Sequence, residues 1–205
     1  MAYLCIKKYR FKMIKPGDKT FYPQNAEEWR NWLEINHEKE SSVWLVFYKR
    51  NSGNPSIKYG DAVDEALCFG WIDSKLNPVD DKKYYQFFTK RKPKSVWSKV
   101  NKEKVERLIA NGKMAPAGLA SIEIAKKNGS WTILDGAEAL EIPSPLKAAF
   151  QENQKAETFF MGLSRSDKRN ILQWLALAKK PETLQKRIGE IIEFGTIGLK
   201  PKPFR

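Results

Sequence analysis

The spacing of apolar residues predicts alternating helices and strands in the first 90 positions of the chain. Asn25 stands where a helix N-cap is expected, and the apolar residues behind it recur at helical spacing, so a helix is predicted over 26–37. Positions 43–48 are six consecutive β-branched, aliphatic or aromatic residues, which predicts a strand buried on both faces. A second helix is expected over 59–71, followed by a turn, and a second strand over 84–89.

From position 96 the pattern is helical to the end of the chain. Pro116, Pro145 and Pro181 each stand where a helix is expected to begin, because the fixed φ of proline suits the first turn and its missing N–H is not needed there. A further amphipathic helix is predicted over 166–178. These elements predict an α+β fold, with a small sheet and packed helices followed by a helical C-terminal module.

Changes in pattern divide the chain into four predicted parts. Residues 1–20 form a basic N-terminal extension, 21–142 an α+β domain, 143–197 a helical C-terminal module and 198–205 a loose basic tail.

Composition limits the class of protein. The chain has 205 residues, of which 41% are apolar and 12% aromatic, and this excludes a disordered or collagen-like protein. No window approaches the roughly 18 to 20 apolar residues of a membrane span, and the first residues contain no apolar stretch typical of a signal peptide. Two cysteines do not make a disulfide framework. A cytoplasmic protein is therefore expected.

Charge is the most informative feature of the sequence. The formal net charge is +13; residues 82–104 carry +8, the first 20 residues +5 and the last eight +3, which leaves −3 for the remainder. Basic segments on a nearly neutral body are typical of proteins that bind polyanions.

Aromatic residues interleave with the central basic segment. Tyr84, Tyr85, Phe87 and Phe88 lie within it, and such rings can stack on exposed bases while cations hold phosphates. The predicted polyanion-binding residues are Lys90, Arg91, Lys92, Lys94, Trp97, Lys99 and Lys102. Single-stranded nucleic acid is the expected polyanion, with anionic envelope components as an alternative. An ordinary solvated surface is the other interpretation of the same pattern.

Two further functions stay open. Trp71, Asp73 and Lys75 follow the second helix and would form a small-molecule or catalytic pocket if they converged. The C-terminal helices would serve as a protein-interaction adaptor if they exposed an apolar patch between Phe159 and Leu177.

Other candidate chemistry favours a structural interpretation. Asp61, Asp64 and Glu65 share a helix face, where carboxylates in the first turns commonly oppose the helix dipole rather than bind a metal. Cys68 would need a base to act as a nucleophile, and the sole histidine, His37, lies on a different helix. No catalytic residue, cofactor or metal site is therefore assigned, and a non-enzymatic protein is expected.

Five strings of residues, in order along the chain, resemble one family. They are FYP at 21–23 with EWRNWL at 28–33, EALCFGWIDS at 65–74, FTKRKPKSVWSKVN at 88–101, MAPAG at 114–118 and AKKPET at 178–183. The chain thereby resembles the bacterial bacteriocin-protection, YdeI/OmpD-associated family over about residues 20–195. The resemblance implies a role in stress or bacteriocin resistance and an association with an envelope porin. It implies no reaction and no set of catalytic or ligand-binding residues.

Overall fold

A computed structural model describes residues 18–205 of the chain. The predicted basic extension over 1–20 therefore lies mostly outside the described residues, and Thr20 already belongs to the first strand. Within the described part, no helix combines the length and the apolar character that crossing a membrane requires.

The described residues form two compact units. The first unit extends to Ser95 and includes Asn101–Lys127, and the second contains Val96–Val100 and Asn128–Arg205. The division falls near position 128, whereas the sequence analysis placed a boundary near position 143.

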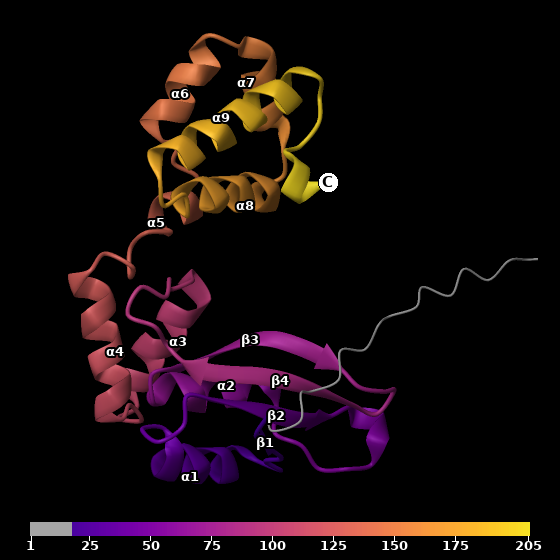
Figure 1. The fold of residues 1–205 in the computed structure, drawn as a ribbon, viewed down its shortest axis with the longest axis vertical. Helices are drawn as coiled ribbons and strands as arrows, with labels where there is room; N and C mark the ends of the chain where they lie inside the picture. Colours follow the sequence, from indigo (N-terminus) through magenta and orange to yellow (C-terminus); the bar gives the residue numbers. More distant parts are fainter. Residues whose placement is uncertain (1–17) are drawn as a thin grey trace, which may run out of the picture. The chain divides into compact units, whose positions relative to one another are not determined.

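The first unit combines a small sheet with helices (Figure 1). Its elements are β1 (Thr20–Phe21), α1 (Ala26–Asn36), β2 (Ser42–Tyr48), η1 (Arg50–Ser52), α2 (Tyr59–Cys68), β3 (Trp71–Pro78), β4 (Lys83–Lys90), α4 (Pro116–Lys127) and all of α3 (Lys99–Ala110) except its first two residues. The strand order is β1-β2-β4-β3, with β1 parallel to β2 and the other neighbours antiparallel. With the helical second unit, this is the α+β fold that the sequence predicts.

The sheet buries one of its two faces. In β2 every second residue is buried, namely Val43, Leu45 and Phe47, while the residues between them are only half-buried. Alternate side chains of a strand point to opposite faces of the sheet. The prediction that this strand is buried on both faces is therefore wrong, because its apolar residues are divided between a core face and a partly exposed face.

Indole rings fill the layer between α1 and the core face. Asn25 caps α1 as predicted, and its Oδ1 accepts a hydrogen bond from the backbone N–H of Glu28 at 3.0 Å. Trp29 and Leu33 on the inner side of α1 are fully buried. The ring of Trp29 packs edge-on against Phe88 of β4, with ring centroids 5.5 Å apart.

The structure has a third strand, β3, at the position where the sequence predicts a turn, and that prediction is wrong. Helix α2 ends at Cys68, and Gly70 adopts a φ of 71°, a left-handed conformation that suits glycine and lets the chain enter β3. Along β3 only Trp71 is buried, and a bulge lies between Asp73 and Leu76. Neither an apolar run nor regular alternation therefore marks this strand in the sequence.

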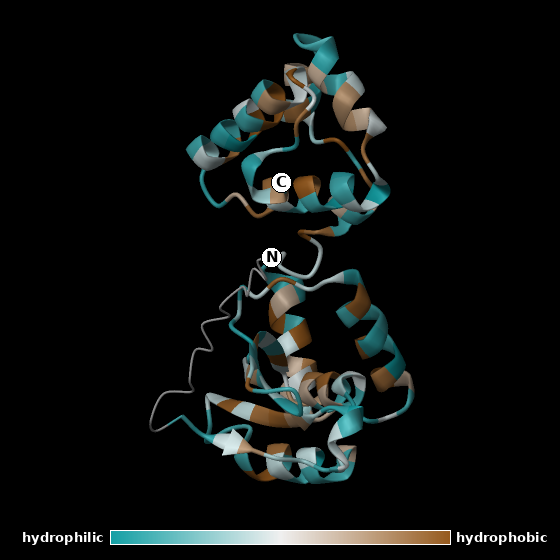
Figure 2. Cartoon of the chain, turned by 90° about the vertical axis from the view of Figure 1, so that its right-hand side faces the viewer, coloured by the Kyte–Doolittle hydropathy of each residue, from teal (hydrophilic) through white to brown (hydrophobic). Residues whose placement is uncertain are grey.

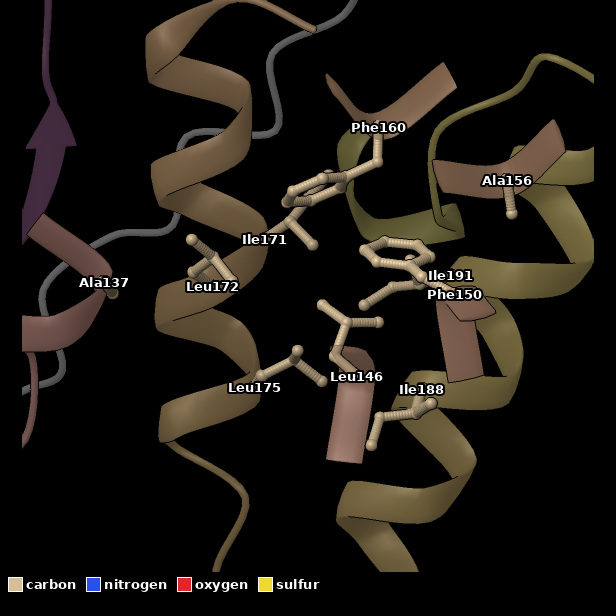
Figure 3. Packing of buried hydrophobic residues seen from close by; sticks show 10 residues of the cluster. All are labelled: Ala137, Leu146, Phe150, Ala156, Phe160, Ile171, Leu172, Leu175, Ile188 and Ile191. Atoms are coloured by element: carbon tan, nitrogen blue, oxygen red, sulfur yellow. The ribbon is translucent and has the colours of Figure 1, made fainter. Parts of the chain in front are cut away.

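The second unit is helical. Its elements are α5 (Asp135–Glu138), α6 (Ser144–Gln151), α7 (Gln154–Gly162), α8 (Arg165–Ala176), α9 (Pro181–Thr196) and the short 3₁₀ helix η2 (Lys202–Phe204). Pro145 and Pro181 stand in the first turns of α6 and α9, as predicted. Hydrophobic and hydrophilic residues alternate along these helices (Figure 2). The inward side chains form one cluster in which Phe150 and Phe160 have ring centroids 5.3 Å apart (Figure 3).

The last residues of the chain pack against this unit. The ring of Phe204 meets Trp174 of α8 edge-on, with centroids 5.7 Å apart, and the Arg205 guanidinium lies 3.8 Å from the ring centroid of Phe194. The prediction of a loose tail over 198–205 is therefore wrong, because its aromatic and basic side chains find partners on α8 and α9.

Candidate nucleic-acid interface

The first of the predicted polyanion-binding residues, Lys90, stands at the end of β4. Lys90 is exposed, and its Nζ donates a hydrogen bond to the carbonyl oxygen of Glu38 at 2.7 Å. A turn follows, in which the N–H of Lys92 donates to Oγ of Ser95 at 3.0 Å and the N–H of Ser95 donates to the Lys92 carbonyl at 2.8 Å. Lys92 and Lys94 are exposed on this turn. Three lysine side chains are thus presented to solvent by a hydrogen-bonded backbone.

Arg91 does not join this cationic surface. Its backbone N–H donates to the carbonyl of Gly70 at 2.9 Å, and the Nε and Nη2 atoms of its guanidinium are shielded from solvent. Burial lowers the pKa of Arg91 to about 10, and the nearby carboxylate of Asp73 opposes this effect. The guanidinium therefore stays charged at neutral pH, but it is largely shielded from solvent, which corrects its predicted role.

The remaining predicted residues are divided between the two units. Trp97 belongs to the second unit and is 1% exposed. It packs there against Trp131, with ring centroids 5.0 Å apart. Its indole is therefore a core group, which corrects its predicted role in stacking. Lys99 is exposed and belongs to the second unit, whereas Lys102 is half-buried and belongs to the first.

Strand alternation divides the four aromatic residues of β4 between the faces of the sheet. Phe88 is fully buried, and Tyr84 stacks on Phe47 of β2 at 5.1 Å with the rings 8° from parallel. Both lie on the core face. Tyr85 and Phe87 lie on the other face and are half-buried. Two of the four predicted rings therefore lie on the face opposite the core.

β2 adds two aromatic residues to the same face, and the sequence analysis missed both. Trp44 pairs with Phe87 across the strands, with ring centroids 4.6 Å apart. Tyr48 contacts Tyr22 edge-on at 5.0 Å. Alternation with a period of two residues would have identified these positions. It cannot be recognised in the sequence, because every residue of 43–48 is apolar or aromatic. We call the face that carries Trp44, Tyr48, Tyr85 and Phe87 the open face.

The predicted pocket residues do not come together. Trp71 is fully buried, and Lys75 is exposed in the bulge of β3. Asp73 accepts hydrogen bonds from the Tyr59 hydroxyl at 2.7 Å and from Nε2 of Gln86 at 3.1 Å. Burial, with the carboxylate of Asp73, raises the pKa of Tyr59. The predicted pocket is thus replaced by a polar cluster around Asp73, separate from both the indole and the lysine.

Two of the three carboxylates considered on α2, Asp64 and Glu65, are held in ion pairs. Asp64 pairs with Lys104 and Arg107 of α3, and the buried Glu65 accepts a hydrogen bond from Nη1 of Arg30 at 2.8 Å. A cavity of about 290 Å³ lies beside these groups. Among residues 18–205, no three His, Cys, Asp or Glu side chains are grouped as a metal ion would require.

The thiol of Cys68 and the imidazole of His37 have different surroundings. Cys68 is fully buried, and burial followed by the charge of Glu65 raises the pKa of its thiol to about 11 against the opposing effect of Arg30. The thiol is therefore protonated at neutral pH and poorly suited to act as a nucleophile. Nδ1 of His37 lies 2.9 Å from the carbonyl oxygen of Leu33, at the end of its own helix.

The second unit exposes apolar residues within the limits predicted for an adaptor surface. Met161 is 53% exposed and Leu177 is 40% exposed, while Phe159 is half-buried. A groove of about 650 Å³ lies between α6 and α9 and includes Ile188 and Ile192 in its lining.

Two family models match separate parts of the chain. Residues 21–121 match a domain of unknown function (DUF8412), and residues 139–194 match the family described as Bacteriocin-protection, YdeI or OmpD-Associated. The second match contains the string AKKPET, while the other strings on which the resemblance rests fall in the first match. No match was found among curated proteins or among solved structures.

Proposed function

We propose that this chain, whose residues 139–194 belong to the bacteriocin-protection, YdeI or OmpD-associated family, binds an anionic polymer and performs no catalysis. The proposed binding surface is the lysine turn, formed by Lys90, Lys92 and Lys94. In this proposal the protein contributes to stress or bacteriocin resistance by binding an anionic partner.

The observation that carries the proposal is the exposure of these three lysines on an ordered backbone. Hydrogen bonds between Lys92 and Ser95 fix the turn, so the three lysine side chains extend from an ordered backbone. Between positions 82 and 102 the sequence contains eight Lys or Arg residues and no Asp or Glu. No carboxylate within this stretch of sequence therefore competes with a phosphate for the lysines.

The chemistry of lysine decides what kind of ligand suits this surface. An ammonium group is a compact, hydrated charge that contacts phosphate or sulfate without demanding a fixed geometry. Binding of this kind gains free energy largely by releasing counterions from the polymer, so it weakens as salt rises. Arg91, between Lys90 and Lys92 in the sequence, keeps its positive charge at neutral pH and contributes to the same field.

The test is a titration of the full chain with a fluorescent single-stranded DNA 12-mer and with heparin, at about 50 mM and about 200 mM salt. The test variant is the triple Lys90→Ala, Lys92→Ala, Lys94→Ala. The control removes the same charge from exposed lysines elsewhere, as Lys127→Ala, Lys147→Ala, Lys155→Ala. We expect the test variant to bind both polymers more weakly, and its slope of log K against log salt to fall by about 0.7 per lost contact on the single strand.

Two results would contradict the proposal. If both triple variants lose affinity equally, net charge alone drives binding and the lysine turn is not the site. If wild-type binding is absent at the lower salt, or does not change between the two salt concentrations, no polyanion site exists on this chain.

A further inference from the structure

The open face of the sheet combines ring surfaces with partial exposure. Its positions on β2 and β4 alternate with the buried core positions, and none of them is fully buried. The residues that β2, β3 and β4 place on this face include Trp44, Val46, Tyr48, Ile72, Asn77, Tyr85, Phe87 and Thr89. β2 and β4 are adjacent in the sheet (Figure 1), so the four rings form one neighbouring group across two strands.

A lysine is the charged strand residue paired across this face. Lys83 lies on it opposite Tyr48, and Lys75 lies in the neighbouring bulge of β3, between Asp73 and Leu76. The strand residues of the open face include no carboxylate. A carboxylate does reach its edge, because Asp18 accepts a hydrogen bond from Nε1 of Trp44 at 3.3 Å. That contact holds the indole by its edge.

The spacing of the rings suits a ligand with repeating flat groups. Alternate residues on a strand lie about 6.8 Å apart, which is close to the step between nucleotides in an extended single strand. Tyr85 and Phe87 are such a pair on β4, and each faces β2 across the sheet. Two successive bases therefore find rings at matching intervals along one strand.

The lysine turn continues the strand that carries these rings. Phe87 and Thr89 are followed directly by Lys90, so a polymer lying along β4 meets stacking surfaces first and exposed cations next. A duplex cannot use the rings, because its bases are already stacked and paired. A strand of unpaired bases uses both the rings and the cations.

We propose that the open face binds the unpaired bases of a single-stranded nucleic acid, with Trp44, Tyr85 and Phe87 as stacking surfaces and the lysine turn holding the phosphates. This deepens the proposed function and rests on it, since the rings act on a polymer that the lysines already attract. The open face supplies preference for single strands, and the lysine turn supplies affinity for anionic polymers in general.

The experiment compares three probes against the full chain: a single-stranded DNA 12-mer, the duplex of the same sequence and heparin. The variants are Phe87→Ala and Tyr85→Ala, with Ile35→Ala as the control that shortens an exposed apolar side chain on α1, the helix on the core face, without removing a ring. Phe87→Leu keeps apolar volume while removing the ring, and it serves if the alanine variant fails to fold. Circular dichroism and a thermal melt check the fold of each variant.

We expect the wild-type chain to bind the single strand at least tenfold more tightly than the duplex. Removing either ring should weaken single-strand binding by about tenfold, since stacking of one base on an aromatic side chain is commonly worth about 1–3 kcal/mol. Binding of the duplex and of heparin should stay unchanged, as should the salt slope. Ile35→Ala should behave as wild type.

The two proposals fail in different ways. If the ring variants bind all three probes as wild type does, or if wild type binds duplex and single strand equally, the open face is not a base-binding surface, although the lysine turn still binds polyanions. If wild type binds none of the probes, the proposed function fails and this inference fails with it.

Discussion

Gly118 of α4 lies against the carbonyl group of Cys68 at the end of α2, so closely that a Cβ at position 118 would stand 2.1 Å from the Cys68 oxygen. The same carbonyl accepts a hydrogen bond from the N–H of Ala115 at 3.0 Å. The approach of α4 to α2 therefore depends on the absence of a side chain at this one position.

Gly118→Ala should destabilise the first unit by about 1–3 kcal/mol, because a backbone carbonyl has to move to admit the methyl group. The measurement is the free energy of unfolding in urea. Gly60→Ala is the matched control, since a Cβ at position 60 of α2 meets no atom within 4 Å and alanine favours the helix. Equal stability of the two variants would show that α4 does not pack on α2 at this distance.

The ion pair between Arg30 and the buried Glu65 should stabilise the fold more than the exposed ion pair between Arg30 and Glu34. Glu65 has only 9% of its side chain exposed, so Arg30→Met leaves a carboxylate without its cation in a poorly solvated site. We expect a loss of about 2–4 kcal/mol in the free energy of unfolding. Glu34→Gln removes the second carboxylate that pairs with Arg30, an exposed one at i,i+4. It should change the free energy of unfolding by less than about 0.5 kcal/mol.

Much of the helical structure follows from local signals in the sequence. The Asn25 cap and the prolines of α4, α6 and α9 mark helix starts, because capping and proline geometry act within one turn of the chain. β3 and the packed C-terminus were missed for the opposite reason. β3 is defined by pairing with β4, and Phe204 is fixed by contact with Trp174, and neither partner is close in sequence.

The candidate site, too, could be predicted only where local sequence decides the structure. Lysines at positions 90, 92 and 94 are exposed, as their charge favours, but the burial of the Arg91 guanidinium among them comes from tertiary packing that the basic run does not indicate. Trp97 is indistinguishable in sequence from a surface ring, because only packing on Trp131 makes it a core residue. Which rings of a fully apolar strand face the core is likewise a property of the sheet rather than of the strand.

The buried thiol of Cys68 should make stability depend on alkaline pH. Its pKa is raised from 9.0 to about 11 in the folded chain, so the folded state holds the proton more tightly than the unfolded state does. The resulting stabilisation is complete below pH 9 and is lost as the pH rises from about 9 to about 11, at up to about 1.4 kcal/mol per pH unit. Urea unfolding at pH 8 and pH 10 measures this loss.

Cys68→Ala provides the control for the pH dependence, because it removes the titrating group. The variant should lose less stability between the two pH values than wild type does, whatever its stability at pH 8. In a Cys5→Ser background, which leaves one thiol, Cys68 should react with a thiol reagent only as fast as the chain opens. Rapid reaction of the folded protein at neutral pH would contradict the burial of this thiol.

The contact between Phe204 and Trp174 should make the C-terminal residues part of the stability of the second unit. Phe204→Ala removes an edge-on ring contact, together with the apolar area it covers, and should cost about 1–2 kcal/mol. The expected readout is faster amide hydrogen exchange in α8 and α9. Met161→Ala, which shortens a side chain that is 53% exposed, should leave exchange unchanged. If Phe204→Ala also leaves it unchanged, the C-terminal residues do not stabilise these helices.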